Sequence, residues 1–371
     1  MIDSKNLRTV GVEEELLIVD PETGAPRAVA GTLLHRATQD APADGDIEYE
    51  LQQQQIEVET SPSSDISEIA RQLKQWRRHT DAAARETGSR IAALATSPLP
   101  VDPQTTFKPR YQTMVRRFGL SSMEQLTCGF HVHVGINDED EGTAVVDRIQ
   151  RWLPILVALS GNSPFWQGRD SGYASFRTQV WSRLPTAGPT DRFGEAAEYH
   201  RVVDRLLASG VPLDKGMIYF NARLSHRYPT VEIRVSDICA RADDAIMIAA
   251  LCRALVQTAA QDSTDGIRHD HPYGEQLRLA QWRASRAGLA EPLLDPWTFT
   301  PRPAEEVVEA LLDHVGPALA ASGDSDLVAE SIERLRKSGT GSDLQRAAYE
   351  AGNDLGAVVR RLIDVTAERL D

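Results

Sequence analysis

Alternating hydrophobic and polar residues predict β-strands in the first two-thirds of the chain. The clearest alternation is in the segment HVHVGI, where every second residue is a valine or an isoleucine. Side chains two residues apart share a face of a strand, so each such segment presents one polar and one apolar face. The predicted strands lie within residues 8–20, 47–60, 91–100 and 124–138, and in a hairpin formed by 216–225 and 229–238.

Apolar residues three and four apart predict helices between and after these strands. One helix begins near Asp65, which can cap it, and runs toward a short strand before residue 95. A second covers residues 142–159, where Pro154 is expected to kink or split it. The other predicted helices cover residues 195–208, 241–260, 274–288, 303–315, 325–337 and 343–370. Because hairpins and long helices connect the strands, without regular βαβ units, the pattern predicts an α+β fold with an antiparallel sheet.

The chain shows no internal repeat and no low-complexity tract, so it is expected to form a single domain over residues 1–371. Its C-terminal portion, from about residue 262 to 371, is mostly helical in pattern. The segment 160–192 has no clear periodicity and is rich in glycine, serine, proline and aromatic residues. A loop of that length in a compact domain is usually functional.

Composition and charge restrict the class of protein. Of the 371 residues, 41% are hydrophobic and 25% are charged, which is typical of a globular protein. Lys and Arg total 40 against 54 Asp and Glu, which gives a net charge of −14. That acidity argues against a nucleic-acid partner, because a phosphate backbone requires a basic surface.

The sequence also indicates where the protein works. It has no apolar run of 18 residues, so no membrane span is expected. Glu13, Glu14 and Glu15 stand where a signal peptide needs apolar residues. The three cysteines lack CxxC spacing, so neither a disulfide framework nor a cysteine zinc site is expected. A cytoplasmic location fits these features.

Ionisable side chains recur two residues apart in the strands, so that each set shares one face. These sets are Glu13 with Glu15, Glu57 with Glu59, His131 with His133, and Glu232 with Arg234 and Ser236; Glu50 precedes Glu57 in the same region. One such set alone is explained better by a solvent-exposed face paired with arginines. Several sets beside bulky apolar residues favour a shared cation, because crowded carboxylates repel one another. Hard oxygen ligands select Mg²⁺ or Mn²⁺, and an arginine on the same face suggests nucleotide phosphates.

The pair His131 and His133 supports a second hypothesis, a metal-dependent hydrolase in which two imidazoles bind one zinc ion. Such an enzyme would carry further histidines and aspartates at the ends of later strands, whereas the later histidines of this chain lie in loops and turns. A third hypothesis is a non-catalytic protein that binds a nucleotide or an amino acid.

Five segments, in this order, resemble the carboxylate–amine ligase family, whose members are commonly called type 2 glutamate–cysteine ligases. They are TVGVEEELLIVD (9–20), ELQQQQIEVET (50–60), CGFHVHVGI (128–136), SGNSPFWQGRDSGYASFRTQVW (160–181) and TVEIRVSD (230–237). The resemblance implies a single catalytic domain with a glutamine-synthetase-like fold. In that fold an antiparallel sheet forms a funnel and helices pack behind it.

The resemblance also implies the reaction and the partners. ATP would phosphorylate a carboxylate, in this family the γ-carboxylate of glutamate, and an amine, typically that of cysteine, would attack the acyl phosphate. The partners would be a small amino-acid substrate and an amine, with ATP and Mg²⁺ (or Mn²⁺) as cofactors. The apolar stripes of the C-terminal helices are expected to pack on the sheet, and they also allow a homo-oligomer.

Transferred position by position, the resemblance implies roles for individual residues. The metal-ligand candidates are Glu13, Glu15, Glu50, Glu57, His131 and Glu232. The catalytic candidates are Arg234, Glu57 and His131. The candidates for binding ATP are Arg234, His133, Arg169 and Arg177, with the last two on the 160–192 loop, which is expected to close as a lid.

Overall fold

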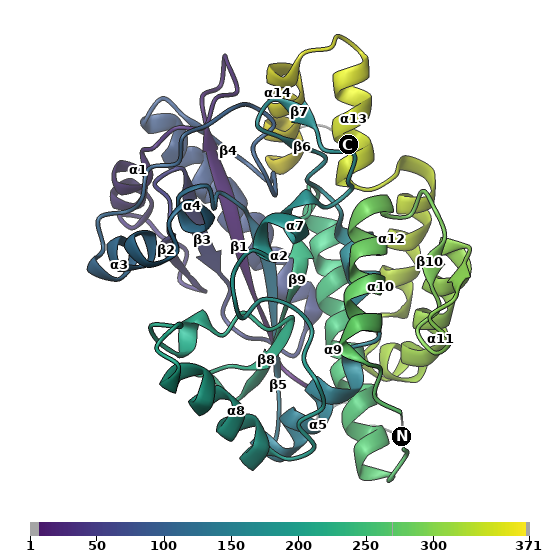
Figure 1. Ribbon diagram of the computed structural model, residues 1–371. Coiled ribbons are helices and arrows are strands. Elements are labelled where there is room, and N and C mark those ends of the chain that lie inside the picture. The colour runs from purple at the N-terminus through teal and green to yellow at the C-terminus, as the bar shows by residue number, and fades with distance from the viewer. Residues whose placement is uncertain (1–6, 269, 369–371) are drawn as a thin grey trace.

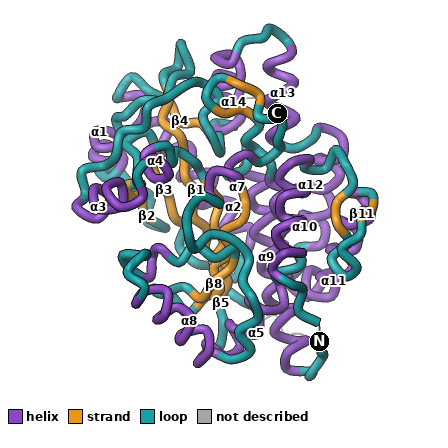
Figure 2. The backbone as a smooth tube through the Cα atoms, in the orientation of Figure 1, coloured by secondary structure: helices purple, strands orange, loops and turns teal. Residues whose placement is uncertain are grey.

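An antiparallel sheet lies at the centre of the molecule (Figures 1 and 2). The computed structural model describes residues 7–268 and 270–368. Over these residues the sheet has seven strands in the order β2-β3-β1-β5-β9-β8, with β4 also paired to β1. The strands are β1 (Val10–Val19), β2 (Asp46–Tyr49), β3 (Gln55–Glu59), β4 (Arg90–Ala92), β5 (Gly129–Gly135), β8 (Ala222–Leu224) and β9 (Thr230–Asp237). The predicted α+β fold with an antiparallel sheet is therefore confirmed.

Helices lie on both sides of this sheet. They are α1 (Ala30–Ala37), α2 (Ile66–Glu86), α3 (Pro109–Phe118), α4 (Leu120–Met123), α5 (Glu139–Ile149), α6 (Leu153–Ser160), α7 (Phe176–Trp181), α8 (Ala196–Ala208), α9 (Ala242–Thr264), α10 (Gly274–Ala287), α11 (Ala304–Ser322), α12 (Ser325–Ser338), α13 (Gly341–Glu350) and α14 (Leu355–Thr366). Two small hairpins, β6 (Phe165–Trp166) with β7 (Arg169–Asp170) and β10 (Leu293–Leu294) with β11 (Pro301–Arg302), and one short 3₁₀ helix (Lys215–Met217) complete the described elements. None of the described helices combines the length and the apolar composition that crossing a membrane requires.

The apolar face of the sheet packs on α9, which is buried on nearly every side. Val12 of β1, Val132 of β5 and Ile233 of β9 belong to one hydrophobic cluster with Ile248 and Leu251 of α9. Around α9 lie α2, α5, α11 and α12, so the helical C-terminal portion shares its core with the sheet. The opposite face of the sheet is thereby left for polar side chains.

Two predicted elements were wrong in their extent. The region 47–60 is not one strand but two, β2 and β3, because the chain turns at residues 50–54 and the strands pair antiparallel. The region 343–370 is not one helix but α13 and α14, with Asn353 at a positive φ of 52° and Asp354 capping the second helix. By contrast, the break expected at Pro154 is confirmed, since α5 ends at Ile149 and α6 begins at Leu153.

Candidate active site on the polar face of the sheet

The strand register gathers the charged side chains on one face. Glu13 of β1 lies opposite Glu59 of β3 on one side and opposite His131 of β5 on the other. Residues directly opposite in an antiparallel pair point to the same side of the sheet. Glu15 likewise lies opposite Glu57. The polar faces predicted for the separate strands therefore lie side by side on one face of the sheet, because the strands are neighbours.

This place is a cavity of about 630 Å³. Four carboxylates, Glu13, Glu15, Glu57 and Glu232, form its acidic floor. Basic and aromatic residues line other parts of the wall, including Lys108, Arg110 and Tyr111 near and on α3, Trp181 of α7, and Lys215, Arg223, Arg227 and Arg234. The volume is within the range of sites that bind small molecules.

Glu13 is held by two imidazoles. Its Oε2 lies 2.9 Å from Nδ1 of His131, and its Oε1 lies 3.0 Å from Nε2 of His133. Burial opposes ionisation of Glu13, but these hydrogen bonds outweigh it and lower the pKa of the carboxyl well below its usual value. Burial also disfavours the charged form of His133, yet Glu13 and Glu232 prevail and raise its pKa. His131 differs, because burial and the nearby charge of Arg234 lower its pKa.

Glu232 is neutralised by two arginines. Nε and Nη2 of Arg223 donate to its carboxylate at 2.7 and 3.0 Å, and Nη1 of Arg234 donates to Oε1. Burial would raise the pKa of Glu232, but the two guanidinium charges lower it below its usual value. This carboxylate is therefore ionised without any added cation.

Glu57 and Glu50 have the opposite electrostatic environment. Burial, and then the charges of Glu13, Glu50 and Glu15, raise the pKa of Glu57 well above its usual value. Within the described part of the chain, no basic side chain pairs with Glu57. Burial and the charge of Glu15 raise the pKa of Glu50 to about 7, although Oε2 of Glu50 accepts a 2.6 Å hydrogen bond from the amide of Leu51. Among the described residues, Glu50 likewise forms no ion pair with a basic side chain, although the charge of Arg234 acts on it.

The donor atoms fit a divalent cation. Ligand atoms of Glu13, His131 and Glu232 lie within 4.8 Å of one another, and so do those of Glu15, Glu57 and His131. Nε2 of His131 is buried and has no hydrogen-bond partner among the described residues. Carboxylate oxygens with one imidazole and no thiolate suit Mg²⁺ or Mn²⁺ better than zinc.

Most of the residues predicted from the sequence line this cavity. They are Glu13, Glu15, Glu50, Glu57, His131, His133, Glu232 and Arg234. Arg169 does not line it, because it lies exposed in the β6–β7 hairpin. Arg177 does not line it either, because it is buried behind the wall at 1% exposure. An ATP-binding role for Arg169 stays a prediction from the sequence alone.

The prediction that Ser236 shares a face of the sheet with Glu232 and Arg234 was wrong. The register between β5 and β9 shifts by one residue, since Val132 lies opposite Ile233 while Phe130 lies opposite Ser236. The extra residue lies in β9 and forms a β-bulge there. It turns Ser236 toward the side of Phe130, which is the hydrophobic core, and Asp237 takes the side of Gly129 and His131.

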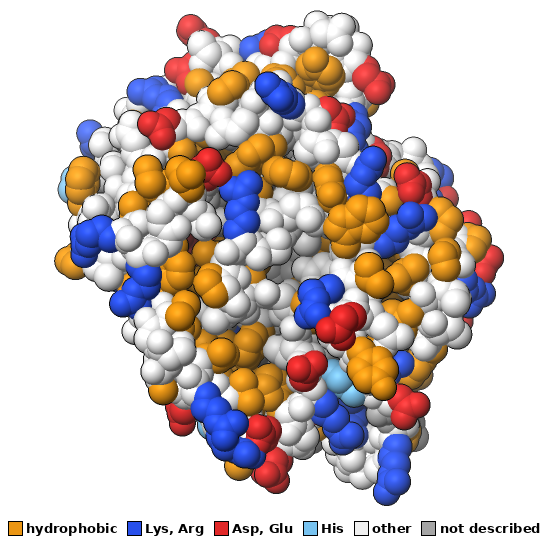
Figure 3. Space-filling view, viewed as in Figure 1, with side chains coloured by type: hydrophobic (Ala, Val, Ile, Leu, Met, Phe, Trp, Pro, Cys, Tyr) orange, Lys and Arg blue, Asp and Glu red, His pale blue; other side chains and the backbone are white. Residues whose placement is uncertain are grey.

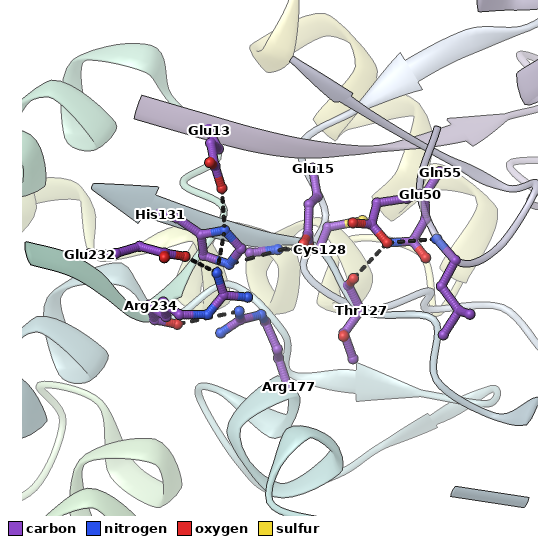
Figure 4. A network of polar contacts seen from close by, with 12 residues as sticks. Glu13, Glu15, Glu50, Gln55, Thr127, Cys128, His131, Arg177, Glu232 and Arg234 are labelled. Carbon is purple, nitrogen blue, oxygen red and sulfur yellow. Dashed lines mark hydrogen bonds and ion pairs between the residues drawn. The ribbon is translucent and has the colours of Figure 1, made fainter. Parts of the chain in front are cut away.

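Sequence analysis also missed residues that line the cavity. Arg223 lies directly opposite Glu232 in the β8–β9 hairpin, so the register of the predicted hairpin was the signal that could have revealed it. Lys108, Arg110 and Tyr111 lie at the start of α3, a helix that the hydrophobic pattern did not predict. Figure 4 shows the ring of His131 between Glu13 and Arg234, with Arg177 beside Arg234.

Comparisons with known proteins define the class and the family of the chain. The profile of glutamate–cysteine ligase family 2 (GCS2) matches residues 9–363. A protein of Streptomyces avermitilis that carries the provisional name glutamate–cysteine ligase 2-1 is 51% identical over 360 residues, covering 97% of this chain and 99% of its own length. A provisionally named glutamate–cysteine ligase 2 of Streptomyces coelicolor is 49% identical over 353 residues, covering 95% and 97%. These matches make the chain an ATP-dependent carbon–nitrogen ligase. Within that class it belongs to glutamate–cysteine ligase family 2, so the resemblance seen in the sequence is confirmed.

Solved structures share the fold. The crystal structure of a glutamate–cysteine ligase from Francisella tularensis in complex with AMP has a TM-score of 0.69 at 14% identity, covering 98% of this chain and 89% of that chain. A bifunctional glutathione synthetase from Pasteurella multocida has a TM-score of 0.68 at 17% identity, covering 97% and 52%. The shared architecture extends over nearly all of this chain.

Proposed function

We propose that this enzyme joins a carboxylate to an amine by an amide bond, with glutamate as the acid and cysteine or another amine as the nucleophile. The observation that supports the proposal is the convergence of side chains from β1, β3, β5, β8 and β9 on one cavity. Glu57, which has no basic partner among the described residues, lies on one side, and Arg223 and Arg234 lie on the other. Such a cavity can receive a phosphate group through its arginines and a divalent cation through its carboxylates. The names of the relatives and the AMP in the Francisella enzyme support the choice of ATP and glutamate.

The proposed reaction has two steps. A carboxylate oxygen of the acid attacks the γ-phosphorus of ATP, and ADP leaves. The nitrogen of the amine then attacks the acyl carbon, phosphate leaves, and the nitrogen loses a proton. Phosphoryl transfer depends mainly on positioning and on neutralising charge, which are the properties this cavity offers.

The acidic floor and His131 would hold Mg²⁺, with Glu50 as a further acid at its edge. When bound, Mg²⁺ supplies positive charge that offsets the charge of the phosphates. Arg234 would hold the transferring phosphoryl group through its planar guanidinium, in exchange for its present contact with Glu232. His133, whose Nδ1 lies 2.9 Å from Oγ1 of Thr230, is fixed in orientation and would contact the substrate or the nucleotide.

A direct test is to incubate the protein with ATP, Mg²⁺, glutamate and a panel of amines that includes cysteine, and to measure ADP release. With ¹⁸O in the γ-carboxylate of glutamate, one labelled oxygen is expected in the released phosphate, because the acyl phosphate transfers it. Amine-dependent ADP release without this label would reject the acyl phosphate. No amine-dependent ADP release from any acid–amine pair would reject the proposal.

The hydrolase hypothesis has less support from the geometry. His131 and His133 bind opposite oxygens of the same carboxylate, Glu13. The groups of described residues that are close enough to share a metal ion contain His131 but not His133. The membership in a ligase family argues against this hypothesis and against a non-catalytic binding protein.

A further inference from the structure

Arg177 is a buried charge next to the active site that the proposed reaction does not use. It lies in the first turn of α7, with 1% of its surface exposed. Its guanidinium is therefore not accessible to a ligand in the cavity. Burying a charge is costly unless other groups compensate it, so its surroundings should reveal its role.

Asp237, at the end of β9, provides one compensating charge. Its Oδ2 accepts hydrogen bonds from the amide of Asn162 at 2.9 Å and from Oγ of Ser163 at 2.7 Å. Its Oδ1 accepts one from Oγ of Ser175 at 2.8 Å. The amide of Arg177 donates to Oγ of Ser163 at 3.0 Å, so the 160–177 loop is fastened to this carboxylate. Asp237 therefore anchors the backbone that carries Arg177, and its negative charge also offsets the charge of the guanidinium.

Arg177 has two connections to Arg234. Its Nη2 donates to the backbone carbonyl of Arg234 at 3.5 Å, beside the bulge in β9 (Figure 4). The ring of Trp181 lies near both guanidinium groups, with its centroid 5.5 Å from Cζ of Arg177 and 5.8 Å from Cζ of Arg234. A cation near an aromatic ring is attracted to its face. Arg177 is thus connected to the backbone of Arg234 by a hydrogen bond and to its side chain through the ring of Trp181.

The neighbouring strand leaves room for this arrangement. A Cβ atom added to Gly129 of β5 would collide with Nη2 of Arg177 and would lie 3.0 Å from Nε2 of His131. Glycine at position 129 therefore allows the guanidinium to lie directly against β5. The close approach of Arg177 depends on the local backbone as well as on charge.

We propose that Arg177, whose backbone is anchored through Ser163 to Asp237, is a positioning residue that holds Arg234 in place through the bulge of β9 and the shared ring of Trp181. The proposal rests on the role of Arg234 at the transferring phosphoryl group. It replaces the prediction from the sequence that Arg177 itself binds ATP. A displacement of a reacting group by about 1 Å can cost about 100-fold in rate, which makes such support important.

The test compares four variants of the whole enzyme: Arg177→Lys, Arg177→Met, Arg234→Met and the double variant Arg177→Met with Arg234→Met. Arg177→Lys keeps the charge beside Asp237 but lacks the planar fork that reaches both Arg234 and the ring. We expect Arg177→Lys to lower kcat by about 10- to 100-fold, with the KM and Kd for ATP changed by less than about threefold. Arg278→Met, on the exposed face of α10, is the matched control and should leave kcat unchanged.

The double variant separates positioning from direct contact. If Arg177 acts through Arg234, the double variant loses no more kcat than Arg234→Met alone. Losses that multiply, or an ATP Kd that rises in proportion to the loss of kcat in Arg177→Lys, would overturn the proposal. So would a folded Arg177→Lys variant with a lower Tm and an unchanged kcat. Because Arg177→Met risks misfolding, Arg177→Lys with Arg234→Met serves as the alternative double variant.

A crystal structure of the Arg177→Lys variant tests the proposal independently of turnover. A displaced Arg234 guanidinium, no longer paired with Glu232, supports it, and an Arg234 that superposes on the wild-type position overturns it. If the wild-type enzyme forms no amide bond, the proposed function fails on its own assay. The position of Arg234 in the variant still decides whether Arg177 holds it.

Discussion

Glu232 and Glu57 point into the same cavity, yet their charges are compensated in opposite ways. Glu232 accepts hydrogen bonds from two arginines, which lower its pKa. Glu57 is buried beside other carboxylates, and burial together with their negative charges raises its pKa. A protein gains no folding stability from an ionised carboxylate in that position. The cost is understandable if the position serves the binding of a cation during the reaction.

Replacing Glu57 by glutamine therefore separates stability from function. In the absence of metal, Glu57→Gln should raise the free energy of unfolding by about 1 kcal/mol, because a like charge is removed from the acidic floor. Turnover should fall by at least about 100-fold, because a ligand of the cation is lost. Urea denaturation in EDTA and the ADP-release assay measure the two effects.

The control for this variant is Glu330→Gln on the exposed face of α12, which should change neither quantity. A Glu57→Gln variant with full turnover would remove Glu57 from the proposed site. A variant that is less stable than the wild type without metal would contradict the electrostatic explanation.

At the scale of elements, the alternation along each strand could be predicted from the sequence, but the places where it changes could not. Glu13, Glu15, His131 and Glu232 were assigned to one face correctly, because strand side chains alternate regularly. Ser236 was not, since the bulge in β9 depends on how two distant strands pair. The turn at residues 50–54 and the helix α3 were missed for a similar reason. Both depend on contacts with residues far away in the sequence.

Gly129 provides a test of the close approach between β5 and α7. Gly129→Ala should lower the free energy of unfolding by about 1–3 kcal/mol, because the added Cβ must displace Arg177 or His131. The kcat should fall as well, because both side chains belong to the support of the site. Chemical denaturation and the ADP-release assay give the two values.

Gly316→Ala in α11 is the matched control, because a Cβ at that position meets nothing within 4 Å. An alanine inside a helix stabilises it by about 0.5–1 kcal/mol relative to glycine, so this control should become slightly more stable. A Gly129→Ala variant that behaves like the control would show that the space beside Gly129 is not required.

A buried ion pair joins the sheet to helix α2. Arg77 of α2 donates from Nε and Nη2 to the carboxylate of Glu14 at 2.8 and 2.6 Å, and also to the carbonyl oxygens of Cys239 and Ala240. Both side chains are at most 1% exposed. Arg77→Met should cost about 3–5 kcal/mol in urea denaturation, because it leaves the charge of Glu14 buried and unpaired.

The double variant Glu14→Leu with Arg77→Met should recover much of this loss, since it removes both charges. If the double variant were as unstable as Arg77→Met, the loss would come from packing and not from the unpaired charge. Neither outcome concerns the catalytic cavity, because Glu14 faces the opposite side of the sheet from Glu13 and Glu15.

At the scale of the whole molecule, the fold divides two tasks between the two faces of one sheet. The helical side supplies a continuous hydrophobic core, which reaches from Val12 in β1 to Leu311 in α11 and Val328 in α12. The other face carries charges that would destabilise a core. Acidic and basic side chains are interspersed over the visible surface (Figure 3), so the net charge of −14 does not form a single field there. The cavity, by contrast, confines the carboxylates of Glu13, Glu15, Glu50 and Glu57 to one small space.

That confinement leads to a prediction about ATP binding by the intact protein. In the proposed reaction the triphosphate lies near the acidic floor, and Coulomb repulsion in a partly desolvated site is large. In EDTA, ATP should therefore bind at least about 10-fold more weakly than in Mg²⁺, as measured by titration calorimetry. AMP carries fewer charges and should show a much smaller dependence on Mg²⁺. If ATP bound equally well in EDTA, the arginines alone would neutralise the phosphates. In that case Glu13, Glu57 and Glu232 would have a different role from holding a cation beneath the nucleotide.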